Sequence, residues 1–441
     1  MKILIPNIGS TSLKWKLFDF PALGEADGRE GEPRLLHKGG FERVTDYASA
    51  VEQCLTELTS AGALASEQDL AAVGFKTIIA KGINGCVRID ERVLQAMEEY
   101  RLLAPAHNPP YIAGIRQFAR RVPRVPLIAL FETAFCQAAP DAMMRYAVPE
   151  AWHDAGVRRW GFHGASHRYV TDRAIQLLST NGPTFSPAFG APPPNARAAA
   201  LEDSLSSRGL SLITCHLGGS SSIAASRNGA AIGSSMGMSP QSGLPQNNRV
   251  GDLDCGALPY IMRTLGLSLD EAEQQLTKES GLKGLSGISN DMRDIESAAA
   301  AGHPGATRAL DVYVASARHW IGAYFFELGG ADAIVFTAGI GEHSATLRGR
   351  MLAGLGRLGI AIDPDRNAAT AGREATISTD DSAVRVLVIP TNEELVVARA
   401  ARKLLLAETE TEANTTWTER TSEVSEPRER SGDMGSPQVS A

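Results

Sequence analysis

The stretch KILIP at residues 2–6, followed by NIGSTS at 7–12 and LKWKLFDF at 13–20, decides the fold of the first half of the chain. The alternation of apolar and polar residues in the third segment is typical of a half-buried β-strand, and the Asn, Gly and Ser before it are turn residues. We therefore predict a β-hairpin, in which Pro6 is expected to interrupt the first strand just before Asn7.

The same order of segments recurs about 200 residues later. The run LSLITCHL at 210–217 is followed by GGSSS at 218–222 and by IAAS at 223–226. Two hairpins with turns of small residues predict a duplicated α/β unit with one such loop in each half. The alternative for either loop alone is an ordinary turn, because Gly and Ser are common turn formers.

Helical and strand patterns alternate along the rest of the chain, which is typical of α/β layers. Helical spacing of apolar residues marks 93–104, 111–122 and 309–330, and buried-strand patterns open 125–135, 332–339 and 384–391. Two segments differ in composition: a Pro-rich stretch at about 182–208 reads as a surface insertion, and 407–441 reads as a disordered tail.

Composition excludes several classes of protein. A length of 441 residues predicts roughly two to four domains, and 43 basic against 50 acidic residues give a net charge of −7, a poor match to a nucleic-acid-binding surface. Five scattered cysteines without CxxC spacing favour a reducing cytoplasm over a disulfide framework or a zinc site. No apolar run approaches the roughly 18 residues of a membrane span, and the first residues lack the apolar core of a signal peptide.

Small-residue loops leave backbone N–H groups accessible, so two such loops facing each other can hold a polyphosphate, although neither matches a Walker A pattern. A third loop, GIGEH at Gly339–His343, follows a predicted strand, the position at which open α/β sheets bind ligands; a tight turn explains it equally well. RRWGFHGASH at Arg158–His167 combines two Arg and two His, and Arg249 lies in a polar, turn-rich stretch. The alternatives are a structural histidine and a solvated arginine.

Taken in order, these segments resemble the acetate kinase family, a branch of the actin and sugar-kinase superfold. The resemblance runs from about Met1 to Arg402 and leaves out the Pro-rich insertion and the tail. It rests on NIGSTSLK at Asn7, LAPAHNPP at Leu103, FETAF at Phe131, RRWGFHGASH at Arg158, ITCHLGGSSS at Ile213, SGLPQNNRVGDLD at Ser242, SGISNDMRD at Ser286, DAIVFTAGIGEHS at Asp332 and VIPTNEEL at Val388.

This resemblance implies an α/β fold of the duplicated actin-like ATPase (ribonuclease H-like) type, with two domains and an active-site cleft between them. We expect an N-terminal domain at 1–150 and a C-terminal nucleotide-binding domain at 151–402, with the last helix packing back on the N-terminal domain. The implied reaction is the reversible, Mg²⁺-assisted (or Mn²⁺-assisted) transfer of the γ-phosphoryl group of ATP to acetate, giving acetyl phosphate and ADP. Such enzymes are typically homodimers, and no nucleic acid or membrane partner is implied.

The resemblance also assigns roles to residues of this chain. It implies catalytic roles for Glu132, His163 and Arg249, and metal binding for Asn7 and Glu393. The substrate-binding positions are the cation Lys76 and the apolar residues Ile78, Ala106, Phe162 and Pro240. The ATP-binding positions are Lys14, His216, Leu217, Gly218, Gly219, Ser220, Asp291, Met292, Arg293, Gly339, Ile340, Gly341, Glu342 and His343.

The chain departs from the family pattern within this set. FKTIIAKG at 75–82 stands where the family has HRVVHGG, so that Lys76 replaces an arginine, and Glu132 replaces an aspartate. GGS at 218–220 replaces GNG, and GIGEH replaces GIGEN. An ammonium group lacks the forked geometry of a guanidinium, and we expect the longer Glu132 carboxylate to compensate for it. The alternative is drift in a weakly used paralogue.

Ala106 stands where a larger aliphatic residue commonly lines the acyl pocket, which predicts a roomier pocket and better use of propionate or butyrate. Two functional alternatives therefore stay open. One is a propionate or butyrate kinase, and the other is a catalytically weak relative that binds nucleotide and acts as a sensor or binding partner.

Overall fold

Two six-stranded sheets organise the computed structural model, which describes residues 1–9, 11–21, 32–105, 107–179 and 209–423. The chain divides into a compact unit at Met1–Ala401, which holds both sheets, and a second unit at Arg402–Ala441. The insertion predicted at 182–208 and the acyl-pocket residue Ala106 lie outside the described residues.

The first sheet begins with the predicted hairpin, and its strand order is β3-β2-β1-β4-β6-β5. β1 is antiparallel to β2, β2 is antiparallel to β3, and β1, β4 and β6 are parallel. The strands are β1 (Lys2–Ile8), β2 (Ser12–Asp19), β3 (Arg34–Glu42), β4 (Leu70–Thr77), β5 (Cys86–Arg88) and β6 (Leu127–Phe131).

The predicted interruption at Pro6 is wrong, because β1 runs unbroken through it to Ile8. Pro6 lies opposite Trp15 of β2, whereas the parallel pairing of β1 with β4 is formed only as far as Leu4. A proline lacks a backbone N–H, and at this position the neighbouring ladder does not need one.

The second sheet repeats the topology of the first, with the order β11-β12-β10-β7-β8-β9. A hairpin and a third antiparallel strand are again followed by parallel strands on the other side of the first strand. The strands are β7 (Ser211–Leu217), β8 (Ser221–Arg227), β9 (Ala230–Ser234), β10 (Ala333–Thr337), β11 (Ala375–Thr376) and β12 (Arg385–Val388). The predicted duplication is confirmed.

Helices fill the connections between strands, and the three helical and three strand patterns read from the sequence all form. The helices are α1 (Tyr47–Ser60), α2 (Glu91–Glu99), α3 (Asn108–Arg121), α4 (Asp141–Met144), α5 (Glu150–Asp154), α6 (Gly164–Leu178), α8 (Ala257–Leu265), α9 (Leu269–Gln274), α10 (Gly281–Ser286), α11 (Met292–Ala300), α12 (Pro304–Glu327), α13 (Ala338–His343), α14 (Ala345–Leu352), α15 (Pro364–Ala368) and α16 (Glu393–Glu423). Within the described residues, no helix is both long and apolar enough to cross a membrane.

The C-terminal helix is longer than the composition suggested. α16 continues to Glu423, so residues 407–423 are helical where a disordered tail was expected. No Gly or Pro occurs between Glu393 and Pro427, and such a run has nothing to terminate a helix. Residues 424–441 of the predicted tail lie outside the described residues.

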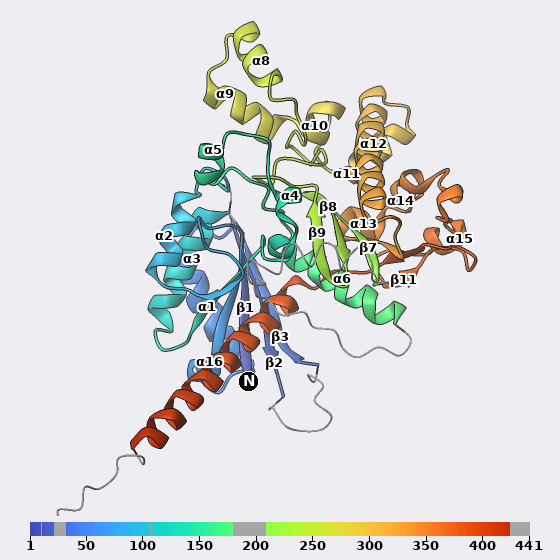
Figure 1. Cartoon of the computed structure of the whole chain (residues 1–441). Helices are drawn as coiled ribbons and strands as arrows, with labels where there is room; N and C mark the ends of the chain where they lie inside the picture. The colour runs from blue at the N-terminus through green and yellow to red at the C-terminus, as the bar shows by residue number, and fades with distance from the viewer. Residues whose placement is uncertain (10, 22–31, 106, 180–208, 424–441) are drawn as a thin grey trace, which may run out of the picture. The chain divides into compact units, whose positions relative to one another are not determined.

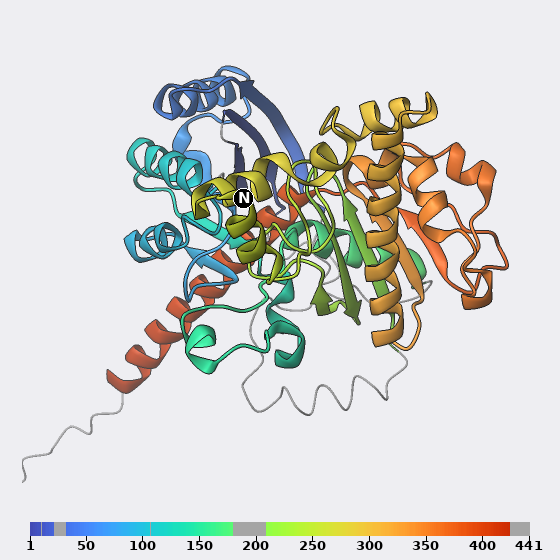
Figure 2. The same cartoon turned by 90° about the horizontal axis from the view of Figure 1, so that it is seen from above.

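Each face of the second sheet packs against a different helix. Ile213, Cys215 and Phe336 share a buried cluster with α12, whereas Leu212 and Val335, one residue away along the strands, share another with α6. The alternation follows from the two-residue period of a strand. Figures 1 and 2 both show α12, in gold and orange, running beside the green strands β7 and β8.

The first sheet is covered in the same way. α1 and α3 pack on one face, as Figure 1 shows. On the other face Gly74 of β4 lies against the start of α16, where an added Cβ would come within 3.1 Å of Val397 and 3.7 Å of Ala401. The absence of a side chain at Gly74 therefore lets α16 approach the strand closely.

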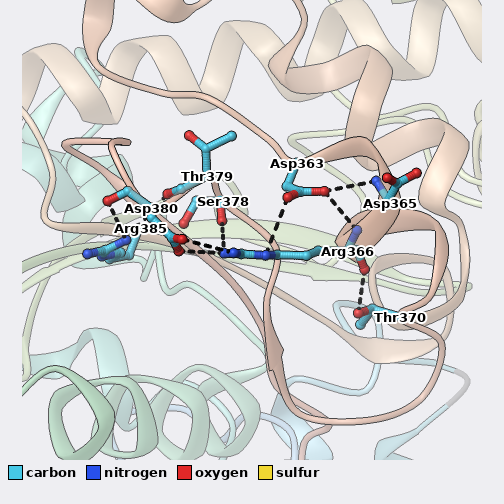
Figure 3. A network of polar contacts seen from close by, with 8 residues as sticks. All are labelled: Asp363, Asp365, Arg366, Thr370, Ser378, Thr379, Asp380 and Arg385. Atoms are coloured by element: carbon cyan, nitrogen blue, oxygen red, sulfur yellow. Dashed lines mark hydrogen bonds and ion pairs between the residues drawn. The ribbon is translucent and has the colours of Figure 1, made fainter.

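A network of polar contacts holds α15 against the segment that leads into β12 (Figure 3). Arg366 donates to the Ser378 carbonyl at 3.0 Å and to Asp380 at 2.8 Å, and Asp363 caps α15 by accepting from the Arg366 backbone N–H at 3.0 Å. Nearby, the fully buried guanidinium of Arg348 donates to the carbonyls of Thr370 and Gly341 at 2.8 and 2.9 Å. Arg348 thereby ties the helix α13 to the end of α15.

Candidate active site

A cavity of about 280 Å³ lies where the carboxyl ends of β1, β4 and β6 meet loops of the second half of the chain. A space of this size has room for a small anion with an acyl group. The predicted site residues that line it are Asn7, Lys76, Ile78, Glu132, Phe162, His163, Ser220, Pro240 and Arg249. Residues far apart in sequence and from both halves of the chain thus meet around one small space.

A buried ion triad stands at one end of the cavity. The Lys76 ammonium lies 3.0 Å from Glu132 Oε1 and also contacts Glu393 Oε2 at the start of α16. Burial alone would lower the pKa of Lys76, but the two carboxylates outweigh it and raise that pKa well above its usual value. Lys76 therefore keeps its charge.

The two carboxylates of the triad differ from each other. Burial raises the pKa of Glu132 despite the neighbouring Lys76, whereas Lys76 and His216 outweigh burial at Glu393 and lower its pKa. The Glu132 side chain is only 3% exposed, and among the described residues its Oε2 has no hydrogen-bond partner. Leaving a buried carboxylate oxygen unpaired is costly, so we expect a cation or a hydrogen-bond donor to bind at Oε2.

The β7–β8 turn lies next to the helix α13. A Cβ built on Gly218 would lie 3.5 Å from the Ala338 side chain, and one on Gly341 would lie 3.6 Å from Leu217. Ala338 has a φ of 64°, which strains a residue other than glycine, and its N–H donates to Glu342 at 2.9 Å. Backbone strain of this kind persists only where the surrounding structure enforces it, and it is concentrated at functional sites.

Arg249 is anchored to the same turn. Its guanidinium donates to the Pro240 carbonyl at 2.8 Å, its own carbonyl accepts from Gln246 N–H at 3.0 Å, and Gln246 Oε1 accepts from the Ser220 hydroxyl at 2.7 Å. Burial lowers the pKa of Arg249 to about 10, which leaves it charged at neutral pH. The turn and the arginine therefore form one bonded assembly.

His163 enters the cavity from the start of α6. Its φ of 58° is left-handed, the next N–H, of Gly164, donates to the Glu132 carbonyl at 2.9 Å, and its ring stacks on His216 at 4.0 Å between centroids. Burial, the neighbouring histidines and the cations Lys76 and Arg249 lower the pKa of His163 well below its usual value. The free site therefore holds a neutral imidazole.

Other predicted residues lie outside the cavity lining. On β2, Lys14 is exposed and pairs with Glu42 at 2.9 Å. Asp291 and Arg293 pair at 2.6 Å at the start of α11, while Met292 points into the core of the second half. His216 lines no part of the cavity but stacks on His163. Gly339–His343, which forms most of the helix α13, adjoins the β7–β8 turn and also lies outside the cavity lining.

The sequence analysis missed four cavity residues: Ile8, Gly9, His107 and Tyr111. Tyr111 donates its hydroxyl to Asn7 Oδ1 at 3.3 Å. Burial, Arg249 and Lys76 lower the pKa of His107 to about 4, so it faces the two cations as a neutral ring. LAPAHNPP and the Tyr111 that follows it contained the available signal, a histidine one turn before a tyrosine at a helix start.

Comparisons with known proteins identify similar sequences and structures. The Acetokinase family model matches residues 2–184 and 197–399. The chain is 40% identical over 422 residues to the acetate kinase of Natranaerobius thermophilus, covering 92% of this chain and 100% of the relative.

Two solved structures are also similar. A Porphyromonas gingivalis acetate kinase gives a TM-score of 0.76 at 32% identity, over 92% of this chain and 99% of that one. A Francisella tularensis propionate kinase gives 0.73 at 30% identity, over 90% and 98%.

We expect Gly164→Ala to damage the site. A Cβ there would lie 2.2 Å from the Glu132 carbonyl oxygen, so Glu132 and His163 must separate. We expect a loss of about 1–3 kcal/mol in the free energy of unfolding, measured by urea denaturation. The control is Gly322→Ala in α12, which has open space around it and should be neutral or stabilising. Equal effects of the two substitutions would contradict this account.

Proposed function

Since this chain belongs to the acetokinase family, we infer that it catalyses ATP-dependent phosphorylation of acetate, reversibly giving acetyl phosphate and ADP. It is a phosphotransferase with a carboxyl group as acceptor. The observation that carries the assignment of the site is one cavity in which Lys76, Arg249 and His163 surround a space the size of a small acyl anion.

Phosphoryl transfer to a carboxylate asks little of a general base, because the carboxylate is already a nucleophile at neutral pH. Charge neutralisation and positioning supply most of the rate. In our proposal Lys76 attracts the acetate carboxylate, Arg249 and His163 face the oxygens of the transferring phosphoryl group, and Glu132 orients Lys76. Ile78, Phe162 and Pro240 form the apolar wall against the methyl group.

The donors in the site also fit Mg²⁺. The unpaired Glu132 Oε2, the Asn7 amide and the Glu393 carboxylate offer the oxygen ligands that this ion prefers. We propose that Asn7 and Glu393 hold it, with Glu132 organising its waters. Mg²⁺ held there would supply positive charge that neutralises the phosphate groups.

We propose that the nucleotide lies along the segments that adjoin the cavity. The β7–β8 turn, with His216 to Ser220, would receive its phosphates through backbone N–H groups. Gly339–His343 and Asp291–Arg293 would contact the nucleoside, with Lys14 beside it. The open space next to Gly339 supports this path.

A second candidate is a preference for propionate or butyrate. A solved relative similar to this chain over 90% of its length is a propionate kinase. The roomier pocket predicted from Ala106 favours the same direction, and one methylene is worth only about 1–3 kcal/mol, so the preference is graded.

The direct experiment is a hydroxamate assay with ATP, Mg²⁺ and a panel of carboxylates. We expect turnover with acetate, a shallow decline along the series to butyrate, and loss of activity with EDTA. Arg249→Ala removes at least one charge-assisted hydrogen bond and should lower kcat/KM by at least about 10- to 150-fold. Arg350→Ala, which breaks a pair between α14 and Asp311 of α12 outside the cavity lining, is the matched control. Nucleotide binding without turnover would favour the sensor alternative.

The contact between Lys76 and Glu132 makes their compensation testable. Lys76→Arg and Glu132→Asp, measured singly and together for kcat/KM, should be non-additive by about 0.5–3 kcal/mol, because the two groups touch. The double variant restores the residue pair typical of the family and should be better than the sum of the single losses. Simple additivity would show that the two positions act independently.

We also propose a cytoplasmic homodimer. All five cysteines are free, as in reducing compartments. α8 has no buried residue, and Tyr260, Leu265 and the nearby Leu269 are 67%, 60% and 54% exposed. An apolar helix face of this kind is typical of an interface with another protein.

Light scattering after size exclusion tests the dimer. We expect the native chain to have twice the monomer mass and Leu265→Asp to reduce it toward one chain. Leu102→Asp, at a leucine 87% exposed elsewhere on the surface, should leave the mass unchanged. A monomeric native protein would refute the proposal.

A further inference from the structure

A chain of hydrogen bonds runs from His163 into the core of the second half. His163 Nδ1 lies 2.8 Å from the Ser222 hydroxyl, which lies 2.7 Å from His167 Nε2. His167 Nδ1 lies 2.7 Å from the Thr214 hydroxyl, which donates to the Ala224 carbonyl at 3.4 Å. Ser222, His167 and Thr214 are at most 1% exposed, so protein groups alone satisfy the chain.

The hydrogens on this chain follow from counting donors and acceptors. Ser222 has a single hydroxyl proton, so it can donate to only one of the two imidazole nitrogens and at least one ring must donate to it. If Thr214 donates to Ala224, it accepts from His167 Nδ1–H, and His167 Nε2 then accepts from Ser222. Ser222 in turn accepts from His163 Nδ1–H. If the hydrogens point the other way along the chain, Thr214 donates to His167 Nδ1 and cannot also donate to the Ala224 carbonyl. One hydrogen bond fewer is then formed.

We propose that His167 is a positioning residue that, through Ser222, fixes His163 in the Nδ1–H tautomer, so that His163 takes up a proton at Nε2 when a phosphoryl anion binds. The inference rests on the proposed function for the identity of the anion. In the Nδ1–H tautomer Nε2 carries only a lone pair, which cannot donate to a phosphate oxygen. A proton from solvent converts His163 to an imidazolium without breaking any bond of the chain.

The surroundings of His163 make this uptake dependent on the ligand. The titratable and charged groups around it are His216 of β7, His167 of α6, Lys76 of β4 with its partners Glu132 and Glu393, Arg249 of the 245–254 loop, and His107 and Tyr111, which line the same cavity. The two cations disfavour a third positive charge, and the two other imidazoles are themselves kept neutral by burial. A dianion in the cavity reverses that balance, because its charge attracts the proton that the cations repel.

Thr214 offers a sharp test because it lies two hydrogen bonds beyond Ser222. Thr214→Val keeps nearly the same shape but removes the acceptor for His167 Nδ1–H. A buried N–H without a partner is rarer than a lone pair without one, so His167 should switch to Nε2–H and reverse the chain. His163 should then carry its hydrogen on Nε2. Thr214→Ser keeps the hydroxyl and is the matched control.

The first measurement is the tautomer of His163 in the full chain without ligand, from long-range ¹H–¹⁵N correlation spectra of ¹⁵N-histidine-labelled protein. We expect Nδ1–H in the native chain and in Thr214→Ser, and Nε2–H in Thr214→Val. An Nε2–H tautomer in the native chain overturns the proposal whether or not any variant folds. Because no substrate is present, the result is independent of the kinase assignment.

The second measurement is calorimetry of sulfate binding in buffers of different ionisation enthalpy. Sulfate is a tetrahedral dianion that does not titrate near neutral pH. The native chain should take up about one proton per sulfate, and its affinity should fall about tenfold per unit rise in pH. Thr214→Val should take up clearly less, since it already presents a donor. Sulfate binding without proton uptake by the native chain would overturn the proposal even if the kinase assay succeeds.

Discussion

The contact of the Lys76 ammonium with Glu132 and Glu393 is the interaction on which the site depends. It joins the end of β4, the residue after β6 and the start of α16, three elements separated by long stretches of sequence. A buried ion group of this kind is not primarily a source of stability, because desolvating the charges offsets much of their attraction. Its effect is to hold a cation and two carboxylates at fixed positions beside the cavity.

Around that triad the backbone is held in strained conformations. His163 and Ala338 are two of four described non-glycine residues with positive φ, and both stand at loops that border the proposed phosphoryl path. Arg348 restrains the helix α13, which begins at Ala338, and the contact of Gly164 with Glu132 restrains His163. The core therefore sets the geometry of the site before any ligand arrives.

The duplicated topology could be predicted from the sequence, because the two-residue alternation of β2 and the matching Gly- and Ser-rich turns are local signals. The unbroken β1 at Pro6 could not be predicted. The C-terminal helix was missed although the sequence carries its signal. The effect of Pro6 depends on where the neighbouring ladder ends, and the extent of α16 follows from the absence of helix breakers rather than from composition.

Nine of the residues to which the family resemblance assigned roles line one cavity, but the resemblance did not identify the contacts among them. The departures from the family pattern led us to expect that Lys76 meets the lengthened Glu132. That Lys76 also contacts Glu393 depends on side-chain reach to the start of α16, which no spacing rule encodes. His107 and Tyr111 were missed because a histidine or a tyrosine at the start of a helix is as often a structural residue as a functional one. Their role emerges only from the cavity that they share with Asn7 and Arg249.

The central claim is that one phosphoryl group is transferred in the space between Arg249, His163 and the Lys76–Glu132 pair. A crystal structure with ADP, Mg²⁺, aluminium fluoride and acetate tests it most directly. The account predicts that the planar aluminium fluoride lies within hydrogen-bond reach of Arg249 and His163, with the acetate carboxylate beside Lys76. Fluoride and acetate bound elsewhere, with those side chains turned away from them, would contradict it.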